Sequence, residues 1–122
     1  MSKTIMVVDD SASVRQVVSI TLKGAGYTVV EACNGKDALK RLDNERIDLF
    51  ISDVNMPEMD GLTLLKSLKM RSDTKFTPVI MLTTETEAAK KEEGRAAGAK
   101  AWVVKPFQPS QMLAAVSKII AS

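Results

Sequence analysis

Five short apolar segments, each followed by a stretch with helical spacing, constrain the fold of this chain most. The segments are Ile5–Val8, Thr28–Ala32, Asp48–Ser52, Pro78–Leu82 and Ala101–Val104. Strands that are apolar almost throughout are typical of parallel sheets, which helices cover on both faces. We therefore expect an α/β fold: an open, five-stranded, doubly wound parallel sheet with five helices and right-handed crossovers. Five βα units are too few for a TIM barrel, which needs eight.

The first expected helix has its apolar residues at helical spacing between Val14 and Ala25. Ser13 and Gln16 have the spacing of a capping box and predict its start, and Gly24 and Gly26 predict its end.

Four further helices complete the pattern. A short helix opens at Asn34, and Asp60 is expected to cap the next one. An Ala/Glu/Lys-rich helix is expected over Glu87–Ala97, and a last helix begins near Pro109.

Composition narrows the possible chemistry. The chain has no histidine, which excludes Ser-His-Asp and Cys-His catalysis and His-ligated metals. Its one cysteine, Cys33, excludes an internal disulfide. A net charge of +2 and 4% aromatic residues argue against nucleic-acid binding. Asp9 ends the first apolar run too early for a signal peptide or membrane insertion, so we expect a cytoplasmic protein.

Polar side chains follow four of the expected strands where each one ends: Asp9-Asp10, Asp53, Thr83 and Lys105. Ligands of open parallel sheets bind beyond the carboxyl ends of the strands, so we expect these side chains at one site. Clustered carboxylates need positive charge, and oxygen ligands suit Mg²⁺. A carboxylate can itself attack phosphorus. No glycine-rich loop follows the first strand, so the dinucleotide fingerprint and the P-loop are absent from that position.

The motifs at the strand ends resemble the receiver domain of two-component response regulators. The resemblance covers the whole chain, read as a single receiver domain over 1–122, and the length is similar to the single-domain chemotaxis (CheY-type) members. It implies a flavodoxin-like sheet with strand order 2-1-3-4-5. The motifs that carry it are Asp9-Asp10, Asp53, Met56-Pro57, Met59-Asp60-Gly61, Thr83 and Lys105-Pro106-Phe107.

The resemblance assigns a role to each acidic residue. It implies that Asp53 accepts a phosphoryl group from the phosphohistidine of a partner histidine kinase. Asp9, Asp10 and Asp53 would hold Mg²⁺, and the backbone carbonyl of Asn55 would complete the protein ligands. Lys105 would pair with the phosphoryl oxygens.

Further residues follow from the same resemblance. Thr83 would hydrogen-bond a phosphoryl oxygen, and Trp102 would occupy the switch position that is usually tyrosine or phenylalanine. Asn55 and Glu85 would flank the path of the hydrolysing water and tune the phosphoryl lifetime. The Lys105–Pro106 peptide bond is expected to be cis.

The implied function is signalling by a monomer that catalyses only its own phosphorylation and slow dephosphorylation. Phosphorylation would shift the surface formed by the helix over 87–97, the strand over 101–104 and the last helix. The expected partners are a histidine kinase, a phosphatase and a downstream protein such as a flagellar motor switch component, which would place the chain in chemotaxis and the control of flagellar rotation.

Three alternatives remain open at the level of sequence. The chain could be an intermediate receiver in a phosphorelay. A flavodoxin-like cofactor carrier has the same architecture, although Asp9-Asp10 would repel a flavin phosphate. A metal-dependent phosphatase with an aspartate nucleophile shares the chemistry, although no cap segment for a substrate is visible.

Overall fold

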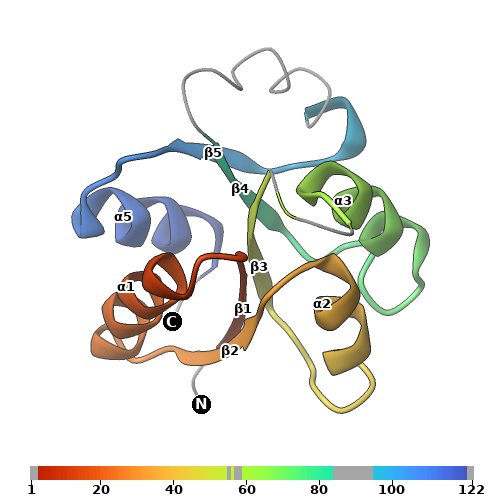
Figure 1. Ribbon diagram of the computed structural model, residues 1–122, viewed down its shortest axis with the longest axis horizontal. Helices are drawn as coiled ribbons and strands as arrows, with labels where there is room; N and C mark the ends of the chain where they lie inside the picture. The colour runs from red at the N-terminus through yellow and green to blue at the C-terminus, as the bar shows by residue number, and fades with distance from the viewer. Residues whose placement is uncertain (1–2, 55, 57–58, 84–94, 121–122) are drawn as a thin grey trace.

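A five-stranded parallel sheet forms the centre of the molecule, with strand order β2-β1-β3-β4-β5 (Figure 1). The computed structural model describes residues 3–54, 56, 59–83 and 95–120. This order confirms the expected doubly wound sheet. The strands are β1 (Thr4–Val8), β2 (Thr28–Ala32), β3 (Leu49–Asp53), β4 (Val79–Thr83) and β5 (Ala101–Val104).

Helices cover both faces of the sheet (Figure 1). α1 (Ala12–Gly24) and α5 (Pro109–Ile119) lie on one face, and α2 (Gly35–Arg41) and α3 (Gly61–Met70) lie on the other. Of the helix expected over 87–97, residues 95–97 are helical and the rest lies outside the described residues. No helix in the described part of the chain is long and apolar enough to cross a bilayer.

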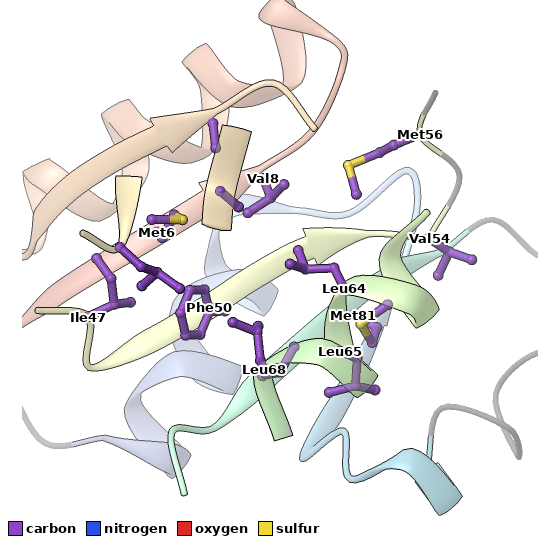
Figure 2. Packing of buried hydrophobic residues seen from close by; sticks show 14 residues of the cluster. Met6, Val8, Ile47, Phe50, Val54, Met56, Leu64, Leu65, Leu68 and Met81 are labelled. Atoms are coloured by element: carbon purple, nitrogen blue, oxygen red, sulfur yellow. The ribbon is translucent and has the colours of Figure 1, made fainter. Parts of the chain in front are cut away.

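The strands divide their side chains between two buried clusters because successive residues point to opposite faces. Ile5 and Val7 of β1 join the cluster under α1 and α5. Met6 and Val8 join the cluster under α2 and α3, where Phe50 is fully buried (Figure 2). Burial on both faces explains why the strands read as continuous apolar runs.

The start of α1 lies two residues earlier than the sequence predicted. The helix begins at Ala12, and the Ser11 hydroxyl accepts the amide hydrogen of Val14 at 3.3 Å. The prediction of Ser13 as the cap was wrong because Asp9 holds Ser11 in place. The Ser11 amide donates to Asp9 Oδ1 at 2.9 Å, which brings this serine to the first turn.

The end of α1 lies at the two predicted glycines: Gly24 is its last residue, and Gly26 makes the turn that follows. Gly26 has φ of 97°, which favours glycine, and its amide donates to the Lys23 carbonyl at 3.0 Å. The Tyr27 amide donates to the Leu22 carbonyl at 3.1 Å. These two bonds form a Schellman motif, which ends the helix and turns the chain into β2.

The start of α3 is built against the end of β3. As predicted, Asp60 caps the helix, with its Oδ1 accepting the Thr63 amide at 2.8 Å. The Gly61 amide donates to the Val54 carbonyl at 2.8 Å. Gly61 is buried, and a Cβ there would overlap the backbone carbonyl oxygen of Asp53. The glycine therefore lets α3 approach the strand end that carries Asp53.

We expect Gly61→Ala to lower the free energy of unfolding by about 1–3 kcal/mol, the usual cost of overpacking a fixed backbone. Gly24→Ala is the matched control, because a Cβ at Gly24 meets no atom within 4 Å. It should raise the unfolding free energy by roughly 0.4–1 kcal/mol through the unfolded state. Urea denaturation measures both, and equal effects of the two substitutions would contradict the close approach at Gly61.

Candidate functional site

Three aspartates meet at the carboxyl edge of the sheet, where β1 and β3 end. Asp9 and Asp10 follow β1. Asp53 is the last residue of β3, the strand that pairs with β1. Their carboxylates offer oxygen atoms that lie within 4.8 Å of one another. Asp9 and Asp53 are buried, whereas Asp10 is exposed. The cluster is thus anchored from within the fold and open to solvent on one side.

Lys105 brings a positive charge into this cluster from the end of β5. Its Nζ lies 3.0 Å from Asp53 Oδ1 and 3.2 Å from Asp9 Oδ2. Burial alone would lower the pKa of this ammonium. The hydrogen bond to Asp53 and the negative charges of Asp9 and Asp53 outweigh burial and raise the pKa above its usual value. Lys105 therefore carries its positive charge at neutral pH.

The charge balance and the donor atoms of the four side chains fit a divalent cation. Three carboxylates and one ammonium carry a formal charge of −2, which a single divalent cation would balance. The available ligand atoms are carboxylate oxygens, which hard cations such as Mg²⁺ prefer. The described carboxylates leave ligand positions for water, as Mg²⁺ usually requires.

Asp53 is fixed by the backbone around it. Its Oδ1 accepts the Val54 amide at 3.0 Å, in addition to the Lys105 ammonium. Its carbonyl oxygen accepts the Ser52 hydroxyl at 3.0 Å. Only 7% of the residue is exposed. The carboxylate is therefore held in one place at the carboxyl edge of the sheet.

Thr83 is the last residue of β4. This strand lies between β3, which ends at Asp53, and β5, which leads to Lys105. Thr83 is 2% exposed, and its carbonyl accepts the Lys105 amide at 2.7 Å. The Lys105–Pro106 peptide bond is cis, the isomer that the resemblance implies. Asn55 and Glu85, the predicted lifetime-tuning residues, lie outside the described residues.

Trp102 lies in β5, paired with Met81 of β4. It is half-buried and packs against the cluster under α2 and α3. Because Thr83 follows Met81 by two residues, the side chains of Thr83 and Trp102 point to the same face of the sheet. The Trp102 Nε1 is buried and has no hydrogen-bond partner among the described residues.

Two residues of the site surroundings were missed at the level of sequence. Arg15 of α1 donates to the backbone carbonyl of Asp9 at 2.6 Å and pairs with Glu31 of β2 at 3.2 Å. No motif in the sequence pointed to Arg15 or Glu31. They meet only because the fold packs α1 beside β1 and β2.

Comparison with known proteins agrees with this geometry. Residues 5–117 match the family of response regulator receiver domains. The chemotaxis protein CheY1 of Helicobacter pylori is 44% identical over 109 residues, covering 86% of each chain. The solved structure of the chemotaxis protein CheY4 of Vibrio cholerae superposes with a TM-score of 0.93 at 48% identity, covering 98% of this chain and 100% of that one.

Longer proteins match as well. The alkaline phosphatase synthesis transcriptional regulatory protein PhoP of Bacillus subtilis is 37% identical over 120 residues, which is 98% of this chain and 49% of that protein. The chain spans about half the length of the first curated relatives it matches. The matched residues include every described member of the acidic cluster and Lys105. The chain therefore belongs to the response regulator receiver domain family.

Proposed function

We propose that this chain is a phosphorylation-switched signalling domain in which Asp53 accepts a phosphoryl group from a phosphohistidine of a partner histidine kinase. One observation carries the proposal: the Asp53 carboxylate lies within an acidic cluster and 3.0 Å from the Lys105 ammonium. This arrangement supplies a nucleophile together with a positive charge for the incoming phosphoryl oxygens.

In the proposed step, a carboxylate oxygen of Asp53 forms a bond to phosphorus while the phosphorus–nitrogen bond to the donor histidine breaks. The departing imidazole keeps the bonding electron pair and remains on the kinase. Lys105 pairs with the phosphoryl group as it arrives, and Asp9 and Asp10 hold the divalent cation together with Asp53. When bound, Mg²⁺ supplies charge neutralisation for the phosphoryl oxygens.

The same arrangement suggests how phosphorylation is read. The phosphoryl group adds negative charge beside Lys105 and Thr83, at the end of β4. We infer that Thr83 turns toward it and that Trp102, on the same face of the sheet, changes its packing in response. The surface formed by residues 95–97, β5 and α5 would then bind its partner with altered affinity.

A role in chemotaxis, through a flagellar motor switch component, is the finer form of the proposal. Its support is the similarity to two chemotaxis proteins over most of their length. The similarity to half of a transcriptional regulatory protein supports receiver chemistry without deciding the output. An intermediate place in a phosphorelay is the second candidate. The family match favours both over a flavodoxin-like cofactor carrier.

Phosphotransfer tests the proposal directly. A panel of labelled histidine kinases is mixed with the wild type, with Asp53→Ala and with Asp73→Ala, a control that removes an exposed carboxylate paired with Arg71. We expect label on the wild type and on Asp73→Ala, loss of it in Asp53→Ala, and loss in all chains when EDTA removes Mg²⁺. Labelling of Asp53→Ala at the wild-type rate would contradict the assignment of the phosphoacceptor.

Tryptophan emission tests the switch, because Trp102 is the one tryptophan in the sequence. Acetyl phosphate with Mg²⁺ should change the emission of the wild type and leave that of Asp53→Ala unchanged, since repacking alters the surroundings of the indole. A wild type that is fully phosphorylated by mass yet shows unchanged emission would rule out Trp102 as the reporting residue.

A further inference from the structure

A guanidinium ties the loop after β1 to the neighbouring strand. Arg15, in the first turns of α1, donates from Nη1 to the carbonyl oxygen of Asp9 at 2.6 Å. Its Nε donates to Glu31 Oε1, in β2, at 3.2 Å. The Arg15 side chain is only 19% exposed. One side chain thus joins α1, the end of β1 and β2.

Both the amide and the carbonyl group of Asp9 are linked to β2. The Asp9 amide donates to the Ala32 carbonyl of β2 at 3.1 Å, and the Asp9 carbonyl is linked to β2 through Arg15 and Glu31. The Ser11 amide fixes the Asp9 carboxylate at 2.9 Å. Asp10, which follows Asp9 directly, is exposed to solvent, so the anchored backbone of Asp9 sets where the Asp10 carboxylate starts.

The positive charge of Arg15 and its hydrogen bond to Asp9 have opposite effects on the affinity of the site for a cation. A guanidinium close to the acidic cluster would repel a divalent cation. Glu31 neutralises that charge through the 3.2 Å pair, so the hydrogen bond to Asp9 is kept while the net charge of the pair is zero. Arginine suits this double task because its planar fork donates in two directions at once.

We propose that Arg15 is a positioning residue for the divalent cation: it holds the Asp9–Asp10 segment in the geometry that binds Mg²⁺, and Glu31 offsets its charge. The inference rests on the proposed function, because the cation it serves is the one that phosphoryl transfer uses. It concerns the affinity of the site for the metal and assigns Arg15 no contact with the phosphoryl group.

The test is the dissociation constant for Mg²⁺, measured by isothermal titration calorimetry with MgCl₂ on the whole chain. The variants are Arg15→Met, which keeps the aliphatic bulk, Arg15→Lys, which keeps the charge without the two-way fork, and Glu31→Gln. The matched control is Arg41→Met, because Arg41 Nε pairs with Asp37 Oδ2 at 3.3 Å on α2. The two guanidinium–carboxylate pairs are alike in atoms and length, and only the Arg15 pair touches Asp9.

We expect all three variants at Arg15 and Glu31 to bind Mg²⁺ about tenfold more weakly, the lower end of the loss seen when an outer-shell partner of a metal ligand is removed. Arg41→Met should keep the wild-type constant. Amide hydrogen exchange without metal should be faster at Ser11 in Arg15→Met than in the control, since that amide bonds the Asp9 carboxylate.

Unchanged affinity in a folded Arg15→Met overturns the inference, and so does tighter binding, which would mean that the guanidinium repels the cation. Full wild-type affinity in Arg15→Lys overturns it as well, because charge alone would then suffice. If Arg15→Met does not fold, Glu31→Gln decides by the same criterion. Binding is measured without a phosphodonor, so a wild type that binds Mg²⁺ but takes no label counts against the proposed function alone.

Discussion

The ion pairs of Lys105 with Asp9 and Asp53 are the interaction on which the rest of the site depends. Two buried carboxylates at the ends of adjacent strands would repel each other, and the ammonium between them lies 3.2 Å from one and 3.0 Å from the other. Lys105 reaches them from β5, across the end of β4. Thr83, which ends β4, therefore lies between the strand end that carries Asp53 and the strand that leads to Lys105, and its carbonyl accepts the Lys105 amide.

The strand order turns local sequence motifs into one site. β1 and β3 are neighbours, so the acidic residues that end them meet although they are far apart in the chain. Gly61 lets α3 approach the Asp53 carbonyl, and Asp60 caps that helix beside the site. The site is open to solvent on the side of Asp10, whereas Asp9 and Asp53 are buried.

The fold and the composition of the cluster could be predicted because each strand is a separate apolar run with its polar residue at one end. The Ser13 cap was wrong since the hydrogen bond from Ser11 to Asp9 is a tertiary effect of the site on the helix. Arg15 and Glu31 escaped prediction for a related reason: their pairing depends on the register of β1 with β2, which spacing along one chain does not encode. The contacts that the start of α1 makes with the ends of β1 and β2 were thus the part that the sequence alone could not supply.

Locating the phosphoryl group tests the central claim most directly. The wild-type chain is phosphorylated with acetyl phosphate and Mg²⁺, reduced with borohydride, which converts an aspartyl phosphate to homoserine, and digested for peptide mass spectrometry. Homoserine at position 53 is the predicted result, with Asp9 and Asp10 unmodified. Homoserine at either of those positions, or a phosphate that survives reduction on a serine or threonine, would contradict the account.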